Sequence, residues 1–188
     1  MVSYYTDYLN VMFNPLSYID AGRFRCHHQM LGTAYGHSVA NNIIINQYKL
    51  SVDRFELTTS SRFIVQNWSI LRDIVFYTGC QVLKSEFIQQ ARFMSLPEPA
   101  RVFLKTTLMP ADIKRPRISF DGRHESILST GYSVFMPAMS LLPLPLRQRI
   151  ILCFPPYVDK QPSSEAVSPV FISLVTRYAK NNPLKLQV

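Results

Sequence analysis

Signatures of catalysis and of ligand binding are missing from this 188-residue sequence. It has no glycine-rich phosphate loop, no His-Glu-x-x-His or Cys-x-x-Cys metal motif, and no Gly-x-Ser-x-Gly around a nucleophilic serine. The acidic residues are isolated rather than paired, which disfavours acid/base catalysis by two carboxylates. Nothing in the sequence therefore makes a recognisable active site, and we expect a protein that is not an enzyme.

Cysteine is also scarce, with three residues far apart in the chain: Cys26, Cys80 and Cys153. An odd, scattered set in a chain of this size predicts reduced thiols in a cytoplasmic protein rather than a disulfide framework. Cys26 precedes His27 and His28, but adjacent side chains do not easily turn toward one ion, and no second cluster completes a tetrahedral site. We expect a polar loop there, and core packing for Cys80 and Cys153.

No uninterrupted apolar run is long enough to predict a membrane span. The 21 residues between Glu125 and Arg147 (147 − 125 − 1) carry no charge, but Pro137, Pro143 and Pro145 interrupt them. We expect a buried helix followed by a proline-rich turn. The N-terminus has no basic region before its apolar residues, so no secretory signal is predicted.

Only six glycines accompany thirteen prolines, while 47% of the residues are hydrophobic. This balance favours short helices joined by rigid, proline-rich connections over a sheet with many tight turns. The sequence predicts an all-α fold, a single compact domain over residues 1–188. Helices are expected at 4–13, 38–50, 61–93 (broken at Gly79), from Pro97, at 125–136, at 146–153 and from Pro169 with Ser168 as N-cap.

Two surfaces are candidates for contact with a partner. Residues 4–13 carry tyrosines at Tyr4, Tyr5 and Tyr8, and an amphipathic helix with such side chains suits a protein interface. In the same helix, the predicted apolar stripe is Tyr5, Tyr8, Leu9, Met12 and Phe13. Basic residues gather in the polar loop at about 109–123, at Lys114, Arg115, Arg117 and Arg123.

The net charge of +8 raises nucleic acid or an anionic membrane as partners. A basic helical domain that binds nucleic acid is one functional class, and its affinity would fall steeply with salt. A cysteine-dependent enzyme is disfavoured, since no local base accompanies Cys80 or Cys153.

Several sequence blocks resemble one family from end to end. Phe13-Asn-Pro-Leu-Ser-Tyr-Ile19 is similar to the Phe-x-Pro-x-x-Tyr-Ile/Leu signature of the type III secretion sorting-platform accessory proteins, the OrgA/MxiK/SctK family. The remaining blocks follow in the family's order: Ala40–Leu50, Asn67–Leu71, Val75–Leu83, Leu128–Tyr132, Leu146–Arg149, Phe154–Val158 and Tyr178–Pro183. Residues 22–37 and 109–123 match poorly.

This resemblance implies a mainly helical, non-enzymatic adaptor at the cytoplasmic face of the bacterial inner membrane. It implies two direct partners: the forkhead-associated-like cytoplasmic domain of the inner-membrane ring protein (PrgH/MxiG/SctD type) and the pod scaffold protein (SpaO/SctQ type). The stator and export ATPase would be held indirectly, and secretion would require the adaptor. The resemblance implies no cofactor, no nucleic acid and no insertion into the membrane.

Overall fold

The computed structural model describes residues 2–25, 32–89, 92–106, 123–162 and 164–184. Within these ranges the chain forms α-helices and short 3-10 helices and no β-strand, which confirms the predicted all-α fold class. The chain divides into two compact units, residues 1–69 with 141–156 and residues 70–140 with 157–188. The extent of a single domain over 1–188 stays a prediction.

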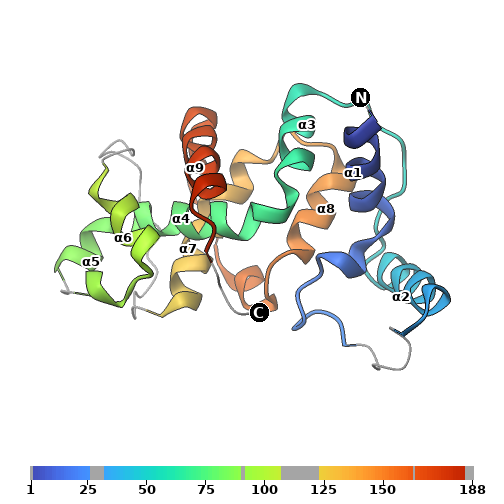
Figure 1. The fold of residues 1–188 in the computed structure, drawn as a ribbon, viewed down its shortest axis with the longest axis horizontal. Coiled ribbons are helices and arrows are strands. Elements are labelled where there is room, and N and C mark those ends of the chain that lie inside the picture. The colour runs from blue at the N-terminus through green and yellow to red at the C-terminus, as the bar shows by residue number, and fades with distance from the viewer. Residues whose placement is uncertain (1, 26–31, 90–91, 107–122, 163, 185–188) are drawn as a thin grey trace. The chain divides into compact units, whose positions relative to one another are not determined.

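The first unit is built around α1 (Val2–Phe13), which packs against α3 (Thr59–Gln66) and α8 (Leu144–Leu152) (Figure 1). After α1, the short helix η1 (Pro15–Ser17) contacts α2 (Ala34–Gln47). Two apolar clusters form the core of this unit. Their buried members are Val11, Val65 and Leu146 in one, and Ile44, Leu50 and Leu152 in the other.

The second unit is built around α4 (Leu71–Val82), against which α6 (Glu98–Lys105), α7 (His124–Ala138) and α9 (Pro169–Asn181) all pack (Figure 1). α5 (Lys84–Gln89) follows α4 directly. The core includes an aromatic cluster in which Tyr77 contacts Phe103 and Tyr178 edge-on, both at 5.2 Å between ring centroids. Such pairs add to the stabilisation that comes from buried area.

Proline and hydroxyl residues define several helix boundaries as predicted. The Ser168 hydroxyl accepts a hydrogen bond from the Phe171 amide at 3.2 Å, and Pro169 occupies the first position of α9. Pro97 precedes α6, whose first turn holds Glu98. These signals are local, so the sequence alone is sufficient to read them.

Two helix predictions were wrong in position. α2 begins at Ala34 rather than after Ser38, because the Thr33 hydroxyl caps it by accepting from the Gly36 amide at 3.0 Å. Residues 34–37 are therefore helical and not loop. Gly79 does not break a helix but lies within α4, and the predicted 61–93 segment divides instead at Asn67–Ile70 and at Leu83.

Candidate functional site

The exposed face of α1 carries apolar and aromatic side chains at every fourth residue. Tyr5 is 61% exposed, Leu9 36% and Phe13 49%, and this spacing places them in one row along the helix. We call these three residues the α1 row. Three large apolar side chains in line on the surface of one helix are a feature of protein-binding faces.

The rest of the predicted stripe faces the interior. Met12 is fully buried, and Tyr8 is half-buried against the cluster around Val11, with its ring 5.6 Å from that of Phe55, edge-on. The sequence prediction of one continuous stripe was therefore too broad. Helical periodicity identifies the apolar residues, but it does not say which of them another element covers.

A buried arginine fixes the C-terminal end of α1. The Arg149 guanidinium donates from Nε and Nη2 to the Met12 carbonyl, at 3.1 and 2.8 Å. Its Nη1 donates to the carbonyls of Ser51 and Pro145, at 2.8 and 3.0 Å. Carbonyls at a helix end carry partial negative charge and partly offset the cost of burying the cation. Burial nevertheless lowers the pKa of Arg149 from its usual value.

An asparagine pair fixes the turn that follows α1. Asn41 of α2 donates from Nδ2 to the Asn14 side-chain oxygen at 2.9 Å and accepts from the Leu16 amide at 2.8 Å. The Tyr18 hydroxyl donates to the Val11 carbonyl at 2.7 Å. These bonds attach the Phe13–Ile19 block to α2 and to the last turn of α1. The position of Phe13 is thereby determined by side chains on both sides of the turn.

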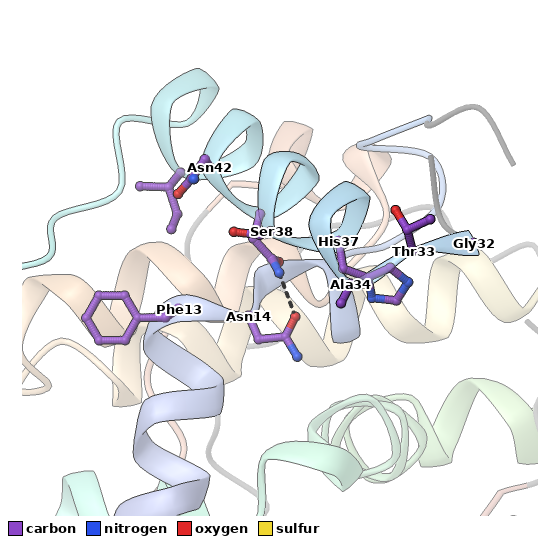
Figure 2. A pocket seen from close by; sticks show the side chains of 10 residues that line it. Phe13, Asn14, Gly32, Thr33, Ala34, His37, Ser38 and Asn42 are labelled. Atoms are coloured by element: carbon purple, nitrogen blue, oxygen red, sulfur yellow. Dashed lines mark hydrogen bonds between the residues drawn. The ribbon is translucent and has the colours of Figure 1, made fainter. Parts of the chain in front are cut away.

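A pocket of about 650 Å³ opens between the end of α1 and the first turns of α2. Figure 2 shows Phe13 and Asn42 toward one end, His37 and Thr33 toward the other, and the Asn14 amide held by a hydrogen bond between them. Within the described part of the chain the lining has no lysine, arginine, aspartate or glutamate; its members are Phe13, Asn14, Gly32, Thr33, Ala34, His37, Ser38, Asn41, Asn42 and Ile45.

This lining defines what the pocket can bind. Amides and hydroxyls offer neutral hydrogen-bonding groups, and Phe13 and Ile45 offer apolar surface. Among the described residues, the lining contributes one histidine and no cysteine or carboxylate, which is neither a set of metal ligands nor a nucleophile with its base. The pocket therefore suits neutral polar groups, and Phe13 belongs to both the pocket and the α1 row.

The predicted contact residues have different outcomes. Tyr5 is exposed, Tyr8 is half-buried, and the side chain of Tyr4 lies outside the described residues. Lys114, Arg115 and Arg117 also lie outside them, whereas Arg123 is exposed and is the N-cap residue of α7 in the second unit. The role of all seven residues in binding stays a prediction.

The cysteines for which the structure gives a position are core residues, as predicted. Cys80 is fully buried within α4, and burial raises the pKa of its thiol, which opposes formation of a reactive thiolate. Cys153 is buried at the end of α8, where its thiol donates to the Arg149 carbonyl at 3.7 Å. Cys26, His27 and His28 lie outside the described residues.

None of the described helices is long and apolar enough to cross a membrane. The charge-free segment after Glu125 forms α7, which ends at Ala138, and α8 begins at Leu144 after Pro143. The expected buried helix and proline-rich turn are confirmed there. Pro137 lies in the last turn of α7, which therefore ends two residues later than predicted. The helix predicted at 146–153 begins two residues earlier, because Pro145 is tolerated in the first turn of α8.

Comparison with known proteins identifies the family. Residues 8–181 match the family of the bacterial type III secretion apparatus protein (OrgA_MxiK). The chain belongs to this family. It is 27% identical to the oxygen-regulated invasion protein OrgA of Salmonella typhimurium over 178 residues, which cover 92% of this chain and 86% of that protein.

Two further relatives match shorter parts. Protein MxiK of Shigella flexneri is 32% identical over 77 residues, 41% of this chain and 44% of that protein. The putative uncharacterized protein YgeO of Escherichia coli K12 is 26% identical over 118 residues, 63% of this chain and 84% of that protein. No solved structure matches the chain.

Hydrogen bonds in the first unit connect several of the sequence blocks that resemble the family. The Phe13–Ile19 block meets the Ala40–Leu50 block through Asn14 and Asn41. The Leu146–Arg149 block meets the end of α1 through Arg149 and Met12. The sequence prediction named only the tyrosines of residues 4–13 as contact residues and did not identify Leu9, Phe13 or the pocket as surface features.

Proposed function

We propose that this protein is a non-enzymatic adaptor of the type III secretion sorting platform, at the cytoplasmic face of the inner membrane. It links the cytoplasmic domain of the inner-membrane ring protein to the pod scaffold protein, and so holds the stator and export ATPase indirectly. Membership of the OrgA/MxiK family over residues 8–181 carries this proposal. The family description names an apparatus component, and the adaptor role is our inference.

The α1 row supports a binding function. Tyr5, Leu9 and Phe13 expose apolar surface on α1. The C-terminal end of this helix is held by buried hydrogen bonds from Arg149. A surface that is rigid before binding loses little conformational entropy when a partner covers it. We therefore assign one of the two partner contacts to the α1 row and to the neutral pocket beside it.

Co-expression tests this function. The chain is produced with the pod scaffold protein, and separately with the cytoplasmic domain of the ring protein, and complexes are resolved by size-exclusion chromatography. We expect a complex with each partner. The double variant Tyr5→Ser with Leu9→Ser should weaken one of these complexes at least tenfold, because it removes apolar contact area at the row.

The matched control is Tyr35→Ser with Ile43→Ser. These α2 side chains are 81% and 42% exposed, so the control removes a similar apolar area outside the row. Both double variants should keep the wild-type circular dichroism spectrum. Absence of any complex with the wild-type chain would overturn the adaptor role, and equal loss in both double variants would overturn the assignment to α1.

A further inference from the structure

Helix α9 in the second unit has a buried face and an exposed one. Its inner face includes Phe171, Val175 and Ala179, all buried. Its outer face carries Val170, which is 70% exposed, Leu174, which is 44% exposed, and the exposed Ser173, Arg177 and Lys180. At 100° per residue these five positions fall within an arc of about 120°. We call them the α9 outer face.

The outer face is held rigidly by contacts of the other side of α9. Ser168 caps the N-terminus, and the Tyr178 hydroxyl donates to the Pro99 carbonyl of α6 at 2.8 Å. The Tyr178 ring also lies 4.5 Å from that of Phe103. The helix is therefore anchored at its beginning and near its end, and its outer side chains have a defined spacing.

The charge of this face is of one sign. α9 contains no acidic residue, and Arg177 and Lys180 make neither an ion pair nor a side-chain hydrogen bond within the described parts of the chain. Glu165, Glu98 of α6 and Asp73 of α4 form no ion pair with them. Within the described residues, two unpaired cations thus follow two exposed aliphatic side chains along the helix.

We propose that the α9 outer face docks an acidic amphipathic helix of a protein partner. Apolar side chains of that helix would cover Val170 and Leu174, and its carboxylates would meet Arg177 and Lys180. Charge complementarity selects this occupant, since it speeds encounter, excludes cationic partners and sets the direction of the docked helix. A groove is not required, because two helices can pack through facing side chains at about 8–10 Å.

An anionic membrane is a weaker match to the same chemistry. Stable attachment to lipid takes a broad apolar face with aromatic side chains, or a cluster of about four to eight cations. The α9 outer face offers two aliphatic side chains and two cations. A protein helix with a short apolar patch and a few carboxylates fits this small, mixed surface better.

A peptide probe tests the chemistry directly. The full chain, labelled with ¹⁵N, is titrated with a helical peptide of about four turns. One face of the peptide carries leucines along one half of its length and glutamates along the other half. We expect amide shifts concentrated in α9 and binding that weakens with salt. Arg177→Glu with Lys180→Glu should reduce affinity at least tenfold, as should replacement of the peptide glutamates by glutamine.

The control variant is Arg25→Glu with Lys160→Glu, which makes the same change in net charge at exposed positions elsewhere. It should bind the peptide like the wild-type chain. A second variant, Leu174→Ser, tests the apolar half without altering charge. Shifts outside α9, equal loss in the control, or tighter binding of α9 to phosphatidylserine vesicles than to the peptide would overturn the proposal.

The same variants in the co-expression assay connect this inference to the adaptor proposal, on which it rests only for the identity of the partner. A partner complex that is lost with Arg177→Glu and Lys180→Glu supports both. A partner complex that survives this change, with no peptide binding, overturns the α9 inference and leaves the adaptor role intact. Peptide binding at α9 without any partner complex overturns the adaptor role alone.

Discussion

Gly79 of α4 and Gly131 of α7 meet where the two helices cross, with backbone against backbone. A Cβ added to Gly79 would lie 2.0 Å from the Ile127 carbonyl oxygen, and one added to Gly131 would lie 1.9 Å from the Val75 carbonyl oxygen. Both obstacles are main-chain atoms, which cannot rotate away as a side chain does. The packing of α4 against α7 therefore requires glycine, which has no Cβ, at both positions.

Replacement of either glycine by alanine should separate the helices. We expect Gly79→Ala and Gly131→Ala each to lower the free energy of unfolding by about 3 kcal/mol, because overpacking against backbone has no inexpensive relaxation. Urea denaturation followed by circular dichroism measures this. Gly32→Ala is the control, since no atom of the described residues lies within 4 Å of its added Cβ. A loss below about 0.5 kcal/mol at Gly79 would contradict this packing.

Removal of the buried guanidinium should destabilise the first unit. Arg149→Met keeps the approximate shape but leaves the carbonyls of Met12, Ser51 and Pro145 without these donors, and we expect a loss of about 3 kcal/mol or more. Arg149→Lys should recover only part of this, because one ammonium lacks the planar fork that reaches separate carbonyls. Thermal unfolding midpoints check this order of stability, which is wild type, then Arg149→Lys, then Arg149→Met.

Arg54→Met supplies the comparison for that experiment, since Arg54 is exposed in the same unit. Its midpoint should stay close to that of the wild-type chain. If Arg149→Met unfolds at the same temperature as Arg54→Met, the carbonyl contacts do not contribute to stability. The α1 row should also lose partner binding in Arg149→Met, since the end of α1 is no longer fixed.

A stabilising substitution is expected at the end of α2. Lys49 has a φ of 48°, in the left-handed region, and the helix ends with hydrogen bonds from the Leu50 amide to the Ile45 carbonyl and from the Lys49 amide to the Asn46 carbonyl. This pattern is the Schellman motif, in which glycine is favoured at the left-handed position. Lys49→Gly should therefore raise the free energy of unfolding by about 0.5–1 kcal/mol.

The same substitution one turn earlier should act in the opposite direction. Asn46 lies inside α2, where glycine costs helix stability, so Asn46→Gly should destabilise by a few tenths of a kcal/mol or more. Chemical denaturation of the two variants in parallel gives the comparison. A loss of stability in Lys49→Gly would show that the lysine side chain contributes more than the strain it imposes.

Asp73 should make stability depend on pH. Burial is the main cause that raises the pKa of this carboxyl, against the Leu184 amide that donates to it at 3.1 Å. Because the folded pKa exceeds the unfolded value, the contribution to stability is complete below the unfolded pKa of about 3.8 and is lost as pH rises through the folded pKa. Asp73→Asn should therefore gain stability relative to the wild-type chain as pH rises from 4 to about 7.

Asp73→Ala separates charge from hydrogen bonding in that measurement. It removes the same charge but also the acceptor for the Leu184 amide, so it should be less stable than Asp73→Asn at every pH. Denaturation midpoints of the three proteins across the pH range test both statements. A difference between Asp73→Asn and wild type that does not change with pH would refute the assigned cause.

Local signals in the sequence determined much of the fold. The Ser168–Pro169 start of α9, the proline before α6 and the periodicity of α1 are each contained within a few residues, so the positions of these helices and the all-α class follow from short-range stereochemistry. The ordered family blocks likewise required no structure. The negative result on catalytic motifs came from the sequence as well.

Tertiary packing decided the rest. Glycine is favoured at helix ends, and Gly79 is therefore predicted to break a helix. It lies inside α4 because α7 approaches too closely there for any side chain. Periodicity placed Leu9, Met12 and Phe13 together, but contacts from other elements bury Met12 and leave the other two exposed. A charged side chain such as that of Arg149 is ordinarily solvated, and it can be buried here only because carbonyls from distant parts of the chain meet around it. Local preference specifies where helices form, whereas long-range contacts select which faces remain for a partner.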